Sequence, residues 1–388
     1  MKKAVVVGGS NGIGLSIVND LQEKNYHVYI LDVCEPNKQL IINDKYTYIY
    51  CNLFDFDEDT FKPFIDDKEV SFLMITAGIG RVADFEYLHI AEIEKTLKIN
   101  TVATIKVLRL FYDRITSQER FYCGIMGSIA GLVSSPMFSV YSASKAAICR
   151  FVESINIELA ANSSLNRILN VSPGSIKGTR FNGGENDLSQ TKQLAKQIVA
   201  KILNSEELFI PDYEEVYKGV LDRYHQDPHA FGFSSYQYKK QSGRAKNEYR
   251  VCIGYLSGTF DLFHIGHLNL LKRAKAQCDY LIVGVHCDAS HKGKETFISL
   301  EERMAIVGSC KYVDKVVQSC REDSDAWDLY RYNKLFVGSD YKGTERFKTY
   351  EKYFEEKGVE IIYFPYTQGT SSSQLRNILT TKLEEKKR

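Results

Sequence analysis

Short apolar runs alternate with amphipathic helical stretches along residues 1–212. The runs are rich in β-branched and aromatic residues, and the stretches between them repeat apolar residues at helical spacing. Strands that alternate with helices in this way are typical of a doubly wound parallel sheet. The predicted strands are Ala4–Val7, Val28–Leu31, Tyr46–Tyr50, Phe72–Thr76, Gly124–Ser128 and Arg167–Ser172, and the predicted helices are Leu15–Glu23, Ala91–Ile115 and Ser144–Ala161.

A second series of the same kind begins near Arg250. The sequence therefore predicts an α/β protein with two domains, 1–212 and 250–388, each a doubly wound parallel sheet of Rossmann type. The second series has a predicted helix at Gly266–Gln277 and predicted strands at Val251–Leu256, Tyr280–Val285, Leu335–Val337 and Glu360–Phe364.

Residues 213–249 lie between the two series and are unusually aromatic. A solvated linker is poor in aromatic residues, so we expect this connector to pack on one or both domains. Its aromatic residues include Tyr213, Tyr217, Tyr224, Phe231, Phe233, Tyr236 and Tyr238.

Composition narrows the class of protein. The length of 388 residues agrees with two domains of roughly 150 residues or more each. The 50 basic and 49 acidic residues give a net charge of +1, which does not indicate a nucleic-acid partner. No apolar run is long enough to span a membrane. The nine cysteines are scattered without a CxxC pair, which favours a reducing, cytoplasmic location.

A glycine-rich loop follows the first predicted strand and opens a helix. Glycines allow a tight turn and a close approach to a pyrophosphate, and the helix N-terminus offers unpaired N–H groups. Asp32 ends the next strand, where a carboxylate accepts from a ribose 2′-OH and repels a 2′-phosphate, so NAD(H) is favoured over NADP(H). The alternative for Asp32 is a strand-end or capping carboxylate. The candidate cofactor residues of the loop are Gly8, Ser10, Asn11, Gly12, Ile13 and Gly14.

Tyr141 and Lys145 are four residues apart on one face of a predicted helix. An ammonium beside a phenol lowers the pKa of the phenol, which is then suited to exchange a proton with a carbonyl oxygen during hydride transfer. Ser128 follows a strand and is placed to bond the same oxygen. A lone YxxxK also occurs by chance on surface helices, so the combination with the glycine loop carries the argument.

With these motifs, residues 1–212 resemble the short-chain dehydrogenase/reductase family. The resemblance implies that Ser128, Tyr141 and Lys145 are catalytic and that Lys145 also binds the nicotinamide ribose. It implies that Asn100 holds a proton-relay water, and that the helix carrying Tyr141 packs across a homo-oligomer. Further cofactor-binding residues implied by the family motifs are Ala77, Gly78, Pro173, Gly174 and Ile176.

A second motif, Ser257–His267, also follows a strand and opens a helix. His264 and His267 place two donors beside the positive end of a helix dipole, which suits the charge that develops on a phosphate under attack. Gly266 allows that phosphate to approach. A zinc site is the alternative, but no third or fourth ligand has suitable spacing; a pair of core histidines is another.

Residues 250–388 resemble the cytidylyltransferase branch of the nucleotidyltransferases, in particular the glycerol-3-phosphate cytidylyltransferases. The motif GTFDxxHxGH is present in full at Gly258–His267, and Tyr366–Ser373 is similar to the family segment RTxGxSTS except that Tyr366 replaces arginine. The resemblance implies in-line attack on CTP with Mg²⁺, and Lys292 and Arg303 on the substrate. The implied CTP residues are Gly258, Thr259, Phe260, His264, Gly266, His267, Lys294, Asp340, Thr370, Ser371, Ser372 and Ser373.

The two predicted activities form one sequence of reactions. A reductase turns a ketose phosphate into an alditol phosphate, and a cytidylyltransferase couples that product to CMP. The sequence therefore predicts a bifunctional enzyme with small-molecule substrates that makes a CDP-alditol of the CDP-ribitol or CDP-glycerol type. The alternatives are an alcohol-oxidising first domain, or one half that serves as a non-catalytic nucleotide-binding or oligomerisation module.

Overall fold

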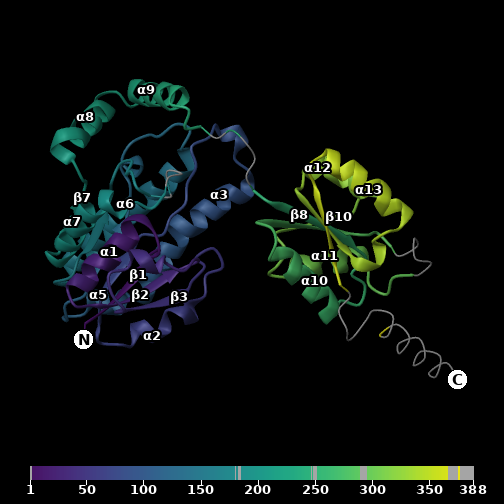
Figure 1. The fold of residues 1–388 in the computed structure, drawn as a ribbon, viewed down its shortest axis with the longest axis horizontal. Coiled ribbons are helices and arrows are strands. Elements are labelled where there is room, and N and C mark those ends of the chain that lie inside the picture. Colours follow the sequence, from purple (N-terminus) through teal and green to yellow (C-terminus); the bar gives the residue numbers. More distant parts are fainter. Residues whose placement is uncertain are drawn as a thin grey trace. The chain divides into compact units, whose positions relative to one another are not determined.

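The structure, a computed structural model, describes residues 2–179, 181, 185–245, 247, 251–288, 295–365 and 375. The chain divides into two compact units, Met1–Tyr249 and Arg250–Arg388 (Figure 1). Each unit holds its own sheet, and both sheets are parallel, as predicted. In the described ranges, no helix combines the length and the apolar character that crossing a membrane requires.

The first unit contains a seven-stranded sheet with the order β3-β2-β1-β4-β5-β6-β7. The strand order reverses between β1 and β4, and ligands of open α/β sheets bind in the crevice at such a reversal, beyond the carboxyl ends of the strands. The strands are β1 (Lys3–Val7), β2 (His27–Asp32), β3 (Tyr46–Tyr50), β4 (Val70–Ile75), β5 (Tyr122–Met126), β6 (Ile168–Val171) and β7 (Leu208–Phe209).

Helices cover both faces of this sheet because its central strands are apolar on both sides. Ala4 and Val6 of β1 pack in one buried cluster with α1 (Gly12–Glu23) and α7 (Lys192–Leu203). Val5 and Val7 point the other way and pack with α4 (Thr104–Leu110) and α6 (Ser139–Ala161). The remaining helices of this layer are α2 (Lys62–Ile65), α3 (Ile90–Leu97) and α5 (Tyr112–Thr116).

The stretch Ala91–Ile115 is helical almost throughout, as predicted, but it is not one uninterrupted α-helix. A π-helical turn at Lys98–Ala103 separates α3 from α4, and Phe111 separates α4 from α5. The apolar residues keep a helical period through the whole stretch, so the pattern does not reveal where hydrogen bonding changes. Single π-turns within helices frequently mark functional sites.

The connector forms helices instead of an extended linker, and it belongs to the first compact unit. A π-turn at Tyr213–Tyr217 leads into α8 (Lys218–Gln226) and α9 (Pro228–Gln241). Asp227 starts α9 by accepting hydrogen bonds from two backbone N–H groups of the first turn.

The second unit has a five-stranded sheet with the order β10-β9-β8-β11-β12, which reverses between β8 and β11. Leu256 of β8 packs with Leu271 and Val307 in the core on one face. On the other face, Tyr255 stacks on Tyr332 with ring centroids 5.0 Å apart. The elements are β8 (Ile253–Gly258), α10 (Ile265–Lys275), β9 (Tyr280–Val285), α11 (Leu300–Gly308), β10 (Lys315–Gln318), α12 (Asp323–Tyr330), β11 (Lys334–Gly338), α13 (Glu345–Glu356) and β12 (Glu360–Phe364).

Candidate active sites

The glycine loop after β1 needs its glycines for space. Gly8 has a φ of +85°, and a Cβ there would lie 2.4 Å from the backbone nitrogen of Ala77. A Cβ on Gly14 would lie 2.2 Å from the carbonyl oxygen of Gly8. Because both contacts are far shorter than real Cβ contacts, only glycine lets α1 begin this close to β1 and β4. The loop fits a dinucleotide whose pyrophosphate approaches the start of α1.

Asp32 lies at the edge of this loop. Its carboxylate accepts hydrogen bonds from the backbone N–H of Ser10 at 3.0 Å and of Val33 at 2.7 Å. Asp32 therefore makes the contacts of a capping carboxylate, the alternative named above. It does so at the position where an adenine ribose is expected. Thr76 donates to the carbonyl oxygen of Gly8 at 2.8 Å and so ties the end of β4 to the loop.

Asn186 is a loop residue that the sequence patterns did not indicate. Its Oδ1 accepts from the backbone N–H of Gly12 at 3.1 Å, and its Nδ2 donates to the side-chain oxygen of Asn11 at 2.7 Å. Ile13 packs partly against the buried cluster beneath α1. The Asn186 amide oxygen therefore bonds the backbone N–H of Gly12, the first residue of α1, in the loop predicted to bind the cofactor.

The predicted reductase residues lie at the carboxyl ends of β4 and β5 and on α6. Tyr141 is 8% exposed, and the ring of Phe138 stacks on it at a centroid distance of 4.1 Å. The Nζ of Lys145 lies 5.7 Å from the Tyr141 ring centroid and donates to the carbonyl oxygen of Met126 at 2.7 Å. Ser128 is buried, and its side chain shares a hydrogen bond with the Tyr141 hydroxyl.

The expected lowering of the pKa of Tyr141 is not seen in this structure. Burial raises the pKa of Tyr141 to about 12, an effect that the Ser128 hydrogen bond partly offsets. Burial lowers the pKa of Lys145 to about 8. Desolvation outweighs the attraction expected between ammonium and phenolate, because the ammonium is directed at a carbonyl oxygen. At neutral pH the phenol therefore keeps its proton.

Asn100 lies in the π-turn and faces the same place. Its Oδ1 accepts from the N–H of Ile79 at 2.8 Å, and its Nδ2 donates to the carbonyl oxygen of Ile79 at 2.8 Å and to Ser144 Oγ at 3.0 Å. A Cβ on Gly78 would lie 3.2 Å from Lys145 Nζ and 3.3 Å from Asn100 Oδ1. The π-turn thus brings the Asn100 amide and the Lys145 ammonium to the same side of Gly78.

The segment after β6 closes the other side. The carbonyl oxygen of Pro173 accepts from the backbone N–H of Ile129 at 3.0 Å and from Ser128 Oγ at 3.4 Å. The carbonyl oxygen of Ile176 accepts from Thr179 Oγ1 at 3.2 Å. The backbone of Gly174 is covered by a tyrosine hydroxyl of the connector.

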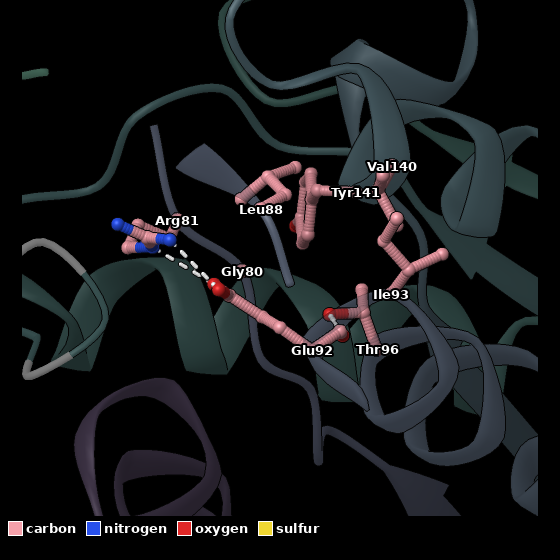
Figure 2. Close-up of a pocket in the computed structure, with 8 residues that line it drawn as sticks. All are labelled: Gly80, Arg81, Leu88, Glu92, Ile93, Thr96, Val140 and Tyr141. Atoms are coloured by element: carbon pink, nitrogen blue, oxygen red, sulfur yellow. Dashed lines mark hydrogen bonds and ion pairs between the residues drawn. The ribbon is translucent and has the colours of Figure 1, made fainter. Parts of the chain in front are cut away.

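A pocket lies beside Tyr141, between the loop after β4, α3 and the start of α6 (Figure 2). Arg81 lines it, but its guanidinium forms a two-point ion pair with Glu92, at 2.8 and 2.7 Å. The charge of this arginine is therefore largely neutralised. The other lining residues are Gly80, Leu88, Ile93, Thr96 and Val140.

In the second unit, His264 and His267 form the first turn of α10. His264 caps the helix, because its Nδ1 accepts from the backbone N–H of Gly266 at 3.0 Å. The Nδ1 of His267 accepts from the backbone N–H of His264 at 3.4 Å, and the centroids of the two rings lie 4.1 Å apart. A ring whose Nδ1 accepts carries its proton on Nε2, so both imidazoles present an Nε2–H donor. Burial lowers the pKa of His264, which keeps that ring neutral at neutral pH.

The loop between β8 and α10 is strained and anchored. Phe260 and Leu262 have φ angles of +53° and +50°, which are unusual for bulky residues. Asp261 between them is 3% exposed and accepts from the backbone N–H groups of Phe297 and Ile298 at distances from 3.1 to 3.2 Å. These bonds hold the loop in a conformation that its own sequence disfavours.

Arg303 was expected to contact the substrate, and the structure gives it a different position. It is fully buried, with an exposed fraction of 0%. Its guanidinium donates to four carbonyl oxygens at 2.7 to 2.9 Å. Arg303 therefore joins the end of β8 to the segment after β9 and positions the loop. The carbonyl oxygens belong to Thr259, His286, Cys287 and Ile298.

The other predicted CTP residues lie around the reversal of strand order. Gly258 ends β8, Thr259 follows it, and Asp340 is exposed after the neighbouring strand β11. The loop after β8 and the residues after β11 therefore follow neighbouring parallel strands, at the same edge of the sheet. Six predicted residues lie outside the described part of the chain: Lys292, Lys294, Thr370, Ser371, Ser372 and Ser373.

Comparison with known proteins confirms the family resemblance of both domains. The short chain dehydrogenase family matches residues 2–190, and the cytidylyltransferase-like family matches residues 255–378. A glycerol-3-phosphate cytidylyltransferase of Bacillus spizizenii is 36% identical over 123 residues, which are 31% of this chain and 90% of that protein. An uncharacterised oxidoreductase of Saccharomyces cerevisiae is 24% identical over 188 residues, 46% of this chain and 61% of that protein.

Among solved structures, a short-chain dehydrogenase/reductase from Burkholderia phymatum in complex with NAD matches with a TM-score of 0.49 and 14% identity, over 58% of this chain and 93% of that one. The two family models define the class: a domain of the short-chain dehydrogenase type fused to a cytidylyltransferase-like domain. Through its second domain the chain belongs to the cytidylyltransferase family.

Proposed function

We propose that this chain is a bifunctional enzyme that makes a CDP-alditol in two steps. The first domain reduces a ketose phosphate to an alditol phosphate, and the second couples that phosphate to CTP. The observation that carries the proposal is that one chain contains both a neutral, buried phenol beside a serine and a lysine, and two imidazoles with Nε2–H donors at a helix start.

In the first domain, the chain's own residues handle the proton. A bound nicotinamide supplies a hydride to the carbonyl carbon. Tyr141 donates its proton to the carbonyl oxygen, which becomes the alcohol, while Ser128 bonds that oxygen and orients it. Lys145 and Asn100 are placed to return a proton to the phenolate. The residues of the glycine loop bind the cofactor, and Asp32 disfavours a 2′-phosphate, which supports NADH over NADPH.

In the second domain, the residues stabilise charge. A phosphate oxygen of the alditol phosphate attacks the α-phosphorus of the Mg²⁺ complex of CTP, the bond to the β-phosphate breaks, and pyrophosphate leaves. His264 and His267 donate from Nε2 to the oxygens on which charge develops. The name of the Bacillus spizizenii relative, a glycerol-3-phosphate cytidylyltransferase, supports a polyol phosphate as the acceptor.

One incubation analysed by mass spectrometry tests the proposal. It contains the full chain, CTP, Mg²⁺, NADH with NADPH, and ketose phosphates of increasing carbon number. We expect a CDP-alditol two hydrogens heavier than the corresponding CDP-ketose. If CTP is consumed only when ready-made alditol phosphates are supplied, the first domain is not a ketose phosphate reductase, and the alcohol-oxidising or non-catalytic alternative holds.

A further inference from the structure

The connector runs along the rim of the reductase site. It leaves β7, which pairs parallel with β6, at the carboxyl edge of the sheet where Ser128 and the glycine loop lie. Its first anchor is Tyr217. A Cβ on Gly174 would lie 1.5 Å from the Tyr217 hydroxyl oxygen, so this hydroxyl rests directly on the Gly174 backbone. The connector thus contacts the residue next to Pro173, whose carbonyl oxygen accepts a hydrogen bond from Ser128.

The connector is anchored again on the segment that leads to the catalytic tyrosine. Lys239 of α9 donates to Ser135 Oγ at 2.6 Å and to the carbonyl oxygen of Pro136 at 2.8 Å. Gly232 is the buried residue of α9, and a Cβ there would lie 3.2 Å from Ser134 Oγ. This segment leads into Phe138, whose ring stacks on Tyr141, so α9 is anchored two residues before the ring that packs on the phenol.

The ammonium of Lys239 is partly buried without a matching negative charge. Both of its hydrogen-bond partners are neutral, and within the described ranges no carboxylate forms an ion pair with it. Burial accordingly lowers the pKa of Lys239 to about 8. The hydroxyl of the neighbouring Ser134 is buried and has no hydrogen-bond partner in the described part of the chain.

Arg81 shows the contrast. It is a cation beside Tyr141, but Glu92 satisfies it with a two-point ion pair (Figure 2). A buried cation that lacks such a partner binds an anion without first breaking an ion pair. In a sugar phosphate, the phosphate is separated from the reacting carbonyl by several bonds. The group that binds it is therefore expected on a neighbouring segment and not beside the phenol itself.

We propose that Lys239 of the connector binds the phosphate of the reductase substrate. The connector then supplies the specificity of the first domain for phosphorylated substrates. This inference rests on the proposed function, since it names the part of the molecule that selects the substrate class of that site.

The kinetic test compares Lys239→Met with Lys240→Met. Lys240 is the adjacent, exposed lysine, whose Nζ donates to Tyr236. We expect Lys239→Met to raise the KM for a ketose phosphate by about 10- to 100-fold, the loss expected for a hydrogen bond to a charged group. Its kcat, the KM for the unphosphorylated ketose and the NADH dissociation constant should stay unchanged. Lys240→Met should change none of these values. An equal rise of KM for both ketoses, or no rise, would overturn the proposal.

A second measurement does not depend on any ketose phosphate being a substrate. The full chain is treated with an amine-reactive reagent with and without inorganic phosphate, and the labelling of Lys239 and Lys240 is read by peptide mass spectrometry. Protection of Lys239 but not of Lys240 supports the anion site even if the reductase assay fails. Equal labelling with and without phosphate contradicts it, whatever the reductase accepts.

Discussion

In the first domain, the loop after β1 comes close to its neighbours because side chains are absent, whereas in the second domain the loop after β8 is held by side chains that are fully buried. Gly8 and Gly14 leave room for backbone contacts that a single Cβ would block. Asp261 and Arg303 hold the other loop by accepting from two N–H groups and donating to four carbonyl oxygens. The comparison teaches that substitutions in the loop after β1 should weaken cofactor binding. Substitutions of the side chains that hold the loop after β8 should destabilise the second domain.

The candidate catalytic groups of the two domains also differ. The first domain places a phenol that keeps its proton beside a lysine whose charge is sensitive to pH. The second domain uses two imidazoles whose tautomers are fixed by backbone N–H groups. Under the proposed function, one site moves a proton and the other only stabilises charge, so changes in each should leave the other intact.

The largest expected effects come from replacing one candidate catalytic residue at a time, first in one domain and then in the other. Tyr141→Phe should lower the rate of reduction by about 10²- to 10⁴-fold, because it removes the proton donor. His267→Ala should lower cytidylyl transfer by about 10²- to 10³-fold, because it removes a donor to the developing charge. Each variant is measured in both assays and serves as the control for the other. Loss of both activities from either change would contradict two independent sites.

Arg303→Met sharpens the comparison of the loops. A buried carbonyl left without a partner costs about 1–3 kcal/mol, so the loss of a side chain that serves several of them should destabilise the second domain by more than ~3 kcal/mol. Calorimetry should show a lower transition temperature for that domain and an unchanged one for the first. Arg321→Met, at an exposed position next to α12, is the matched control and should change little. A stable Arg303→Met with a raised KM would restore the substrate-contact role expected from the family.

Gly14→Ala tests the first loop. The added Cβ meets the Gly8 carbonyl at 2.2 Å, and the backbone shift this requires costs about 1–3 kcal/mol in close-packed sites. We expect NADH to bind at least ~10-fold more weakly in a fluorescence titration, while cytidylyl transfer is unaffected. Gly219→Ala, whose Cβ would have its nearest neighbour at 3.5 Å, is the control. Normal NADH affinity in Gly14→Ala would show that the cofactor binds elsewhere.

The smallest effect is a difference in pH dependence. The pKa of Lys145 is lowered to about 8, so its positive charge is present below pH 8 and is lost as the pH rises through that value. The kcat for reduction should therefore fall by about tenfold per pH unit above 8. Transfer should show no such step from His264, whose pKa is lowered and whose ring is already neutral. The measurement uses saturating substrate, so that titration of Lys239 does not contribute; a flat kcat profile would exclude a need for the lysine charge.

The sequence predicts much of this fold because the central strands are apolar and bounded by turns. Tyr46–Tyr50, Tyr280–Val285 and Glu360–Phe364 were predicted with the bounds that the structure has. Strands β7 and β10 were missed, since short edge strands depend on pairing with a neighbour more than on their own pattern.

The motifs indicate which side chains come together, but they do not reveal what burial does to those side chains. Tyr141 and Lys145 lie on one helix with Ser128 beside the phenol, yet the effect of burial on the Tyr141 pKa has no sequence signal. The motif around Arg303 predicts a contact with the substrate, whereas in the folded chain Arg303 is buried and bonded to backbone carbonyl groups. Asn186 and Lys239 reach their sites from loops and helices distant in sequence, so only the folded chain reveals them.

The central claim is that the product of the first domain is the substrate of the second. The most direct test supplies nicotinamide cofactor carrying deuterium at both C4 positions, together with CTP, Mg²⁺ and a ketose phosphate. The account predicts a CDP-alditol with one deuterium, bound to the carbon that was the ketone. Deuterium in a free alditol phosphate with no labelled CDP product would show that the two activities do not form one sequence of reactions and would contradict the account.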